Sequence, residues 1–198
     1  MTLPKFYAIF DHPDWLERLL PVGIKLVQMR VKDTPESALR NLLIRSRDLC
    51  RTHGAQLVVN DYWQLAIDLD CDFVHLGQED LDSADIPALR RAGMRLGIST
   101  HDHAELDRAL SFDPDYIALG PVWPTMLKKM KWEQQGLERV TKWKRLIGDI
   151  PLIAIGGLTP ERAVQAFAAG ADVASAVTDI TLNPDPEGRI RDWLEVAP

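Results

Sequence analysis

Three long polar side chains alternate with shorter ones in residues 28–33 (QMRVKD), directly after the mostly apolar residues 23–27. This pattern indicates the end of a buried strand. Because a strand turns successive side chains to opposite faces, Gln28, Arg30 and Lys32 are expected to share one face. A guanidinium and an ammonium on such a face need an anionic partner or an opening to water. The stretch therefore predicts a binding site for a phosphate or a diphosphate.

Two aspartates follow neighbouring apolar runs further along the chain. Asp61 comes directly after residues 56–60, and Asp80 ends the segment HLGQED that begins at His75. Neighbouring strands lie about 5 Å apart, so the two carboxylates are expected to converge. Such a pair beside a diphosphate predicts Mg2+, which binds one or two carboxylates together with phosphate oxygens and water. For each aspartate alone, a turn or a helix cap is the alternative.

A pair of glycines, Gly156 and Gly157, precedes a well-marked helix start with Thr159 as N-cap and Pro160 at the first helical position. Backbone N–H groups in such a turn bind phosphates, and barrels often place a phosphate after their seventh and eighth strands. An ordinary tight turn is the alternative.

The longest irregular stretch, residues 120–136, carries a run of lysines. Long loops in compact domains are often lids or binding loops, so Lys128 is expected to reach a phosphate from this loop. A solvated run of charge is the alternative for Lys128, Lys129 and Lys131.

Histidines and cysteines show no spacing typical of metal ligands. His75, His101 and His103 are therefore interpreted as hydrogen-bonding residues, and Cys50 and Cys71 as free buried thiols. The sequence contains no P-loop, dinucleotide fingerprint or Ser/His/Asp nucleophile pattern.

The composition of the 198 residues is ordinary for a globular protein, with 46% hydrophobic and 26% charged residues. The net charge of −6 argues against nucleic acid as a partner. No apolar run is long enough to cross a bilayer and no leader-like segment opens the sequence, so a cytoplasmic protein without membrane contact is expected. No linker or shift in composition divides the chain, which predicts a single domain over residues 1–198.

Short apolar runs alternate with amphipathic stretches along the whole chain. The runs predict strands over residues 6–10, 26–31, 56–60, 73–76, 96–99, 116–119, 152–155 and 173–177. The stretches predict helices over residues 15–20, 38–52, 63–68, 86–92, 104–111, 137–147, 160–169 and 186–195. Thr34 and Pro35 are expected to begin the second helix, and Gly54, Gly93 and Gly170 to cap helix ends. Eight such units predict an α/β fold, a single-domain (β/α)8 TIM barrel with its catalytic end at the loops after the strands.

Several segments together resemble the thiamine phosphate synthase (thiamin-phosphate pyrophosphorylase) family over nearly the whole chain. They are residues 28–33, 60–63, 75–80, 97–101, 117–121 and 154–157. The resemblance implies a (β/α)8 barrel and a transferase that uses Mg2+. Its small-molecule substrates would be 4-amino-2-methyl-5-(diphosphooxymethyl)pyrimidine and 4-methyl-5-(2-phosphooxyethyl)thiazole, or the carboxylated form of the thiazole. Its products would be thiamine phosphate and diphosphate.

The same resemblance assigns roles to particular residues. The pyrimidine diphosphate would be bound by Gln28, Arg30, Lys32, Asn60, Ser99 and Lys128, of which Arg30, Lys32, Ser99 and Lys128 would be catalytic. Mg2+ would be held by Asp61 and Asp80. The thiazole phosphate would lie against Thr125, Gly157, Val177 and Thr178. The matching segments would add Met29, Val31, Met126 and Leu127 to the substrate contacts, and exposed barrel helices leave room for a homodimer.

The chain departs from the family pattern on the thiazole side. The family usually has Thr-x-Thr-Lys on the long loop, where residues 125–128 read TMLK, and Ser-Ala where this chain has Thr178 and Asp179. Residues 131–132 (KW) also stand where smaller side chains are more usual.

Two other functions are therefore considered. One is a thiazole tautomerase-like isomerase that uses a histidine such as His101, and the other is a non-catalytic phosphate-ligand binding protein. The retained Arg30, Lys32, Asp61 and Asp80 favour the synthase, in which the diphosphate departs before the thiazole nitrogen attacks and no protein nucleophile is needed.

Overall fold

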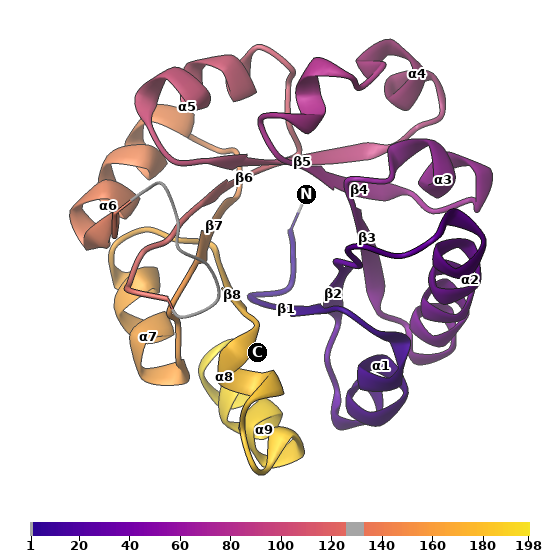
Figure 1. The fold of residues 1–198 in the computed structure, drawn as a ribbon. Helices are drawn as coiled ribbons and strands as arrows, with labels where there is room; N and C mark the ends of the chain where they lie inside the picture. The colour runs from indigo at the N-terminus through magenta and orange to yellow at the C-terminus, as the bar shows by residue number, and fades with distance from the viewer. Residues whose placement is uncertain (1, 126–132) are drawn as a thin grey trace.

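A closed barrel of parallel strands is the framework of the chain in this computed structural model, which describes residues 2–125 and 133–198 (Figure 1). The strands are β1 (Phe6–Phe10), β2 (Leu26–Met29), β3 (Gln56–Asn60), β4 (Phe73–Leu76), β5 (Arg95–Thr100), β6 (Tyr116–Leu119), β7 (Leu152–Ile155) and β8 (Val173–Ala176). Each strand pairs with the next in sequence order, and β8 pairs with β1 to close the ring. The (β/α)8 TIM barrel predicted from the sequence is confirmed.

Helices surround the barrel on its outer side (Figure 1). They are α1 (Pro13–Leu19), α2 (Glu36–His53), α3 (Trp63–Asp68), α4 (Ile86–Arg91), α5 (His103–Leu110), α6 (Gly136–Ile147), α7 (Pro160–Ala168), α8 (Thr178–Thr181) and α9 (Pro186–Val196). Two short 3-10 turns, η1 (Leu20–Val22) and η2 (Asp80–Asp82), complete the described elements. Within the described ranges, no helix combines the length and the apolar character needed to span a membrane.

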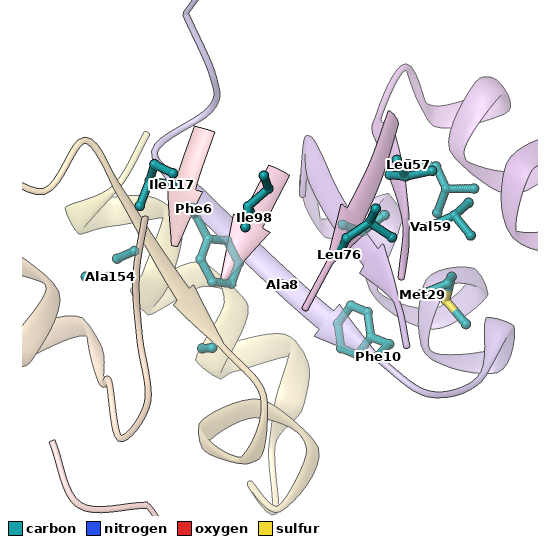
Figure 2. Close-up of a cluster of buried hydrophobic side chains, with 14 of the residues drawn as sticks. Phe6, Ala8, Phe10, Met29, Leu57, Val59, Leu76, Ile98, Ile117 and Ala154 are labelled. Atoms are coloured by element: carbon teal, nitrogen blue, oxygen red, sulfur yellow. The ribbon is translucent and has the colours of Figure 1, made fainter. Parts of the chain in front are cut away.

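Side chains of the strands form two separate layers because alternate residues point to opposite sides of the sheet. The outer layer packs between the strands and the helices and contains Phe6, Ala8 and Phe10 of β1, together with members from the other strands (Figure 2). The inner layer fills the barrel with Leu3, Tyr7, Leu26, Val58, Phe73, Tyr116, Ala118, Ile153 and Val173. Burial on both faces explains why the strands read as nearly continuous apolar runs.

The two ends of the barrel interior differ in chemistry. At the strand starts, Leu3 packs into the inner layer, and the Arg95 guanidinium lies 4.4 Å from the centre of the Phe73 ring. Toward the strand ends, the buried inner side chains become polar, as at Gln28 and His75. The interior is therefore apolar around Leu3 and Phe73, with Arg95 at the strand starts, and polar toward the ends of the strands.

Most of the predicted helix ends are confirmed. Thr159 caps α7, with its hydroxyl accepting from the Arg162 N–H at 3.3 Å. Gly54, Gly93 and Gly170 follow α2, α4 and α7 with positive φ angles.

The predicted start of the second helix is wrong. Pro35, not Thr34, is the N-cap of α2, and the Thr34 hydroxyl donates instead to the Lys32 carbonyl at 3.0 Å. The extended conformation of Pro35, with ψ of 144°, places the first helical residue at Glu36. The preceding strand is also shorter than predicted, because β2 ends at Met29. Arg30 and Lys32 therefore belong to the loop after β2.

Candidate active site

Cations and carboxylates from three consecutive units meet at the carboxyl ends of β2, β3 and β4. The Lys32 ammonium forms an ion pair with the Asp61 carboxylate. Arg30 and Asp61 both lie close enough to His75 of β4 to influence its pKa. The structure thus brings together the groups from which the sequence predicted a diphosphate site. All of them lie at the end of the barrel where loops follow strands.

The backbone of Asp61 adopts the left-handed conformation, with φ of 65°. This conformation costs a residue other than glycine about 1 kcal/mol and is often found at functional sites. The Asp61 N–H donates to the His75 carbonyl at 2.9 Å, which fixes the end of β3 against β4. The Trp63 N–H then donates to the Asp61 carbonyl at 2.8 Å. These hydrogen bonds hold the strained turn and direct the Asp61 side chain to the rim.

Asp80 opens the turn η2 and lies beside Asp61. Its carboxylate accepts a hydrogen bond from the Gly77 N–H at 3.0 Å. Burial raises the pKa of Asp80, and the charge of the neighbouring Asp61 raises it further. Two carboxylates this close repel each other when both are ionised, and a bound cation removes that repulsion. The pair therefore fits a divalent metal ion.

Magnesium agrees with this set of donors. The residues described in the structure contain no group of three or more His, Cys, Asp or Glu side chains that could hold a metal ion. Mg2+ accepts such a site because it retains water and binds phosphate oxygens alongside one or two carboxylates. A diphosphate beside Asp61 and Asp80 would supply those oxygens.

Polar side chains inside the barrel form one continuous chain of hydrogen bonds, called here the interior chain. Gln28 Nε2 lies 2.8 Å from the Tyr7 hydroxyl, which lies 3.1 Å from the Tyr116 hydroxyl. The Tyr116 hydroxyl lies 2.8 Å from His75 Nδ1, and His75 Nε2 lies 2.7 Å from Ser99 Oγ. Gln28 and Ser99, both expected to bind substrate, are therefore the two ends of the interior chain.

Burial controls the charge states along the interior chain. It lowers the pKa of His75 to about 4, with the Asp61 and Arg30 charges as smaller influences. Burial also raises the pKa of Tyr7 and Tyr116 well above their ordinary value. Both phenols and the imidazole are therefore neutral near pH 7.

Some buried polar atoms lie near these groups without a hydrogen-bond partner in the described part of the chain. Asn60 Nδ2, at the end of β3, is a donor, and Gln78 Oε1, in the segment after β4, is an acceptor. Gln78 is itself held by its Nε2, which donates to the Ser99 carbonyl at 2.8 Å. Buried polar atoms are normally paired in native proteins, so these atoms are suited to bind a ligand or ordered water.

The glycine turn after β7 packs against the loop after β6. The Val122 N–H donates to the Ile155 carbonyl at 2.9 Å, and the Trp123 N–H donates to the Gly156 carbonyl at 3.0 Å. Gly157 has φ of 65°, and a Cβ there would lie 2.4 Å from the Pro124 carbonyl oxygen. Only glycine fits this position without displacing the loop.

Val177 and Thr178 form the start of α8, beyond the end of β8. Both are partly exposed, as are Gly157 and Thr125. The departure from the family pattern at Asp179 has a structural explanation, because its carboxylate accepts two hydrogen bonds from Arg189, at 2.8 and 2.9 Å. Trp193 Nε1 donates to the same carboxylate at 2.8 Å. Asp179 is thus committed to holding α8 against α9.

Other residues singled out in the sequence have structural partners. His101 Nδ1 lies 2.7 Å from a Glu105 carboxylate oxygen, and the ring of His103 packs on Trp143 at 4.7 Å between centres. Cys50 and Cys71 are both free, Cys50 buried and Cys71 partly buried. The hydrogen-bonding interpretation is confirmed for His75 and His101, whereas His103 is held by its ring contact. The cysteines are free as predicted, apart from the partial exposure of Cys71.

Some residues of the expected substrate contacts lie elsewhere. Met29 is buried in the outer layer, because strand alternation turns it away from Gln28 toward the helices, and Val31, in the loop after β2, is buried in the same layer. Met126, Leu127 and Lys128 lie outside the described residues, as do Lys129, Lys131 and Trp132.

Tyr7 and Tyr116 are the site-related residues that sequence reasoning missed. Each stands in an apolar run and has the size expected of a core residue, so the sequence carries no local signal for its hydroxyl. Only the register of the barrel brings the two hydroxyls together.

A closed parallel barrel with converging carboxylates and cations at its strand ends defines a TIM-barrel enzyme. A family model described as thiamine monophosphate synthase matches residues 6–180. The chain belongs to this family, whose thiamine-phosphate synthase activity is a transferase activity.

Individual relatives agree with this membership. A thiamine-phosphate synthase from Rhizobium etli is 59% identical over 194 residues, which cover 98% of this chain and 95% of that protein. One from Cronobacter sakazakii is 42% identical over 191 residues, covering 96% of this chain and 91% of that protein. The solved thiamine phosphate pyrophosphorylase from Pyrococcus furiosus superposes with a TM-score of 0.86 at 25% identity, covering 97% of this chain and 94% of that one.

Proposed function

We propose that this chain condenses the aminopyrimidine diphosphate with the thiazole phosphate, or its carboxylated form, at the rim formed by the loops after the strands. The observation that carries this proposal is the meeting of Lys32, Asp61 and Asp80 beside the end of the interior chain. A diphosphate needs cations, and the paired carboxylates need a divalent ion that also binds phosphate. One bound substrate satisfies both requirements.

The leaving diphosphate is bound by Arg30 and Lys32, with Lys128 as a further cation from the long loop. Asp61 and Asp80 would hold Mg2+, which neutralises charge on the departing diphosphate when it is bound. The carbon–oxygen bond breaks with its electron pair going to the diphosphate, and the electron-rich aminopyrimidine stabilises the methylene cation. The thiazole nitrogen then donates its lone pair to form the new carbon–nitrogen bond. No protein nucleophile takes part.

The pyrimidine lies against Gln28, Asn60 and Ser99 in this proposal. Asn60 Nδ2 is the buried donor left without a partner among the described residues, and Ser99 ends the interior chain. The thiazole phosphate lies near Gly157, Val177, Thr178 and Thr125, where the turn after β7 and the start of α8 offer backbone N–H groups. The fixed packing of Gly157 under the loop after β6 supports this position.

We also propose that residues 1–198 act as one domain in the cytoplasm, on small molecules alone and without nucleic acid or membrane. The net charge of −6 supports the exclusion of nucleic acid. A homodimer is part of the proposal, and light scattering after size-exclusion chromatography measures it directly.

The test of the function is diphosphate release from both substrates and Mg2+ in a coupled assay. Asp80→Asn is expected to lower kcat by at least about a hundredfold, as loss of a group that stabilises transition-state charge commonly does. Lys128→Ala is expected to have an effect of similar size. The matched control is Asp82→Asn, two residues further along η2, where the carboxylate is 73% exposed and paired with Arg108. It should stay within about twofold of the unaltered chain.

The same assay separates the other two functions. Conversion of the thiazole without diphosphate release would support the tautomerase-like isomerase. Tight binding of the phosphates without any turnover would support the binding protein. A normal rate in Asp80→Asn would contradict the assigned metal site.

A further inference from the structure

The interior chain has a single direction of hydrogen-bond donation, which follows from counting its protons. An amide nitrogen can only donate, so Gln28 Nε2 donates to the Tyr7 oxygen. The Tyr7 hydroxyl has one proton of its own, and the Tyr116 oxygen is the acceptor placed beside it at 3.1 Å. Tyr116 then donates its own proton to His75 Nδ1 at 2.8 Å.

The direction of these bonds selects one tautomer of His75. Because Nδ1 accepts from Tyr116, it carries no proton, and a neutral imidazole then carries its proton on Nε2. His75 Nε2 therefore donates to Ser99 Oγ at 2.7 Å. In this arrangement every buried O–H and ring N–H of the interior chain has an acceptor, as buried polar groups require.

The direction also decides what the two ends present to a ligand. Ser99 Oγ already accepts from His75, so its own O–H remains available as a donor. Ser99 is partly exposed, which gives that donor access to the mouth of the barrel. Gln28 uses its Nε2 on Tyr7 and keeps its carbonyl oxygen as an acceptor. If the hydrogen bonds ran in the opposite direction, Ser99 would offer a lone pair to the ligand and Gln28 its N–H groups.

We infer that Tyr7, Tyr116 and His75 are positioning residues that fix Ser99 as a hydrogen-bond donor and Gln28 as an acceptor, and that this fixed pattern selects the amino form of the pyrimidine. An aminopyrimidine supplies the matching groups, since its ring nitrogens accept and its amino group donates. This inference rests on the proposed function, because it assumes that the pyrimidine binds between Gln28 and Ser99.

The selection has a physical basis in the cost of mismatched polar groups. In a 4-oxo analogue, an oxygen acceptor replaces the amino donor and the neighbouring ring nitrogen carries a hydrogen. Such a ligand would place its oxygen against the Gln28 carbonyl oxygen and its ring N–H against the Ser99 O–H. It would have to bind instead through the second N–H of Gln28 and the second lone pair of Ser99, which lie in other directions. A buried polar group left without its partner costs about 1–3 kcal/mol, which makes the discrimination about fivefold to a hundredfold for each mismatch.

The first experiment measures the tautomer of His75 directly in the unaltered protein. With 15N-labelled histidine, the protonated and unprotonated ring nitrogens give well separated NMR signals, and loss of one set in His75→Gln assigns them. We expect the proton on Nε2. A proton on Nδ1 would mean the opposite direction and would overturn the inference, whether or not the protein shows synthase activity.

The second experiment measures discrimination as the ratio of kcat/KM for the amino substrate to that for its 4-oxo analogue. In Tyr116→Phe, Tyr7 loses its acceptor and His75 Nδ1 loses its donor. Gln28 can then turn its amide and His75 can change tautomer. We expect the ratio to fall by at least about tenfold. Any difference in intrinsic reactivity between the two substrates cancels because the same pair is compared in both proteins.

A matched control tests whether the effect is specific to the interior chain. Thr100→Val removes a buried hydroxyl from the same strand as Ser99 but from its opposite face, where Thr100 Oγ1 accepts from Trp143 Nε1 at 2.9 Å. Its ratio should equal that of the unaltered protein. If the kcat/KM ratio fell equally in Thr100→Val and Tyr116→Phe, or did not fall in Tyr116→Phe, the positioning role would be refuted. If the unaltered protein releases no diphosphate, the proposed function fails, and the tautomer measurement still decides the direction of the chain.

Discussion

Acidification is expected to destabilise the fold through His75, the buried imidazole of the interior chain. Burial lowers the pKa of His75 from 6.5 to about 4. The unfolded chain therefore takes up a proton on this residue at a higher pH than the folded chain does. The stabilisation is fully present above pH 6.5 and is lost as the pH falls from 6.5 toward 4.

The magnitude follows from the two pKa values. Over the full interval, about 2.5 pH units at 1.36 kcal/mol each give roughly 3 kcal/mol. Between pH 7.5 and 5.0, the part lost through His75 is about 2 kcal/mol. Urea unfolding at these two pH values, followed by circular dichroism, measures the difference in the free energy of unfolding.

His75→Asn provides the comparison, because asparagine does not titrate and all other titratable residues of the chain are unchanged. This variant should be less stable at pH 7.5, since it disrupts hydrogen bonds to Tyr116 and Ser99. Between pH 7.5 and 5.0, the free energy of unfolding of this variant should decrease by about 2 kcal/mol less than that of the unaltered protein. Equal losses in both proteins would show that His75 does not stay neutral in the folded state, and the reasoning from burial would be refuted.

Further predictions concern the thiazole side and the thiols. Gly157→Ala should raise the KM for the thiazole phosphate severalfold and destabilise the fold by about 1–3 kcal/mol, because a left-handed alanine there displaces the neighbouring loop; steady-state kinetics and urea unfolding check both effects. Asp179→Ala should cost about 1–3 kcal/mol in urea unfolding, because Arg189 would lose a partly buried partner and Trp193 Nε1 its acceptor. Burial raises the pKa of Cys50 to about 12 and that of Cys71 to about 11. A thiol reagent at pH 8 should therefore react at least about tenfold more slowly with the folded protein than in urea.

The fold could be predicted from the sequence because its strands are buried on both sides. Runs such as residues 6–10, 116–119 and 152–155 are apolar throughout, and the structure places strands at the same bounds. The short α8 was missed because four residues do not complete a periodic pattern. The start of α2 was predicted wrongly because Thr34 has the residue type of a cap but bonds to the Lys32 carbonyl.

The candidate site could be predicted from the sequence only at residues whose type is itself unusual beside a buried strand. Asp61, Asp80 and Lys32 are charged residues in the short segments that follow apolar runs, where a parallel barrel carries its functional groups. Tyr7 and Tyr116 are distant in sequence and look like core residues. Their hydroxyls meet only because the barrel closes between β8 and β1, which no local pattern contains. Likewise, the hydrogen bond from the Asp61 N–H to the His75 carbonyl, which helps to hold the left-handed backbone of Asp61, reaches across to β4 and leaves no local signal in the sequence.

The apolar side chains that fill the barrel near the strand starts determine where substrates enter and products leave. Leu3, Phe73 and their neighbours occlude the passage along the axis, so nothing can enter at one end and leave at the other. Both substrates must therefore enter, and both products leave, at the end of the barrel formed by the loops after the strands. Diphosphate that stays bound at this end would block the next pyrimidine substrate, so rapid removal of diphosphate from solution would relieve this product inhibition.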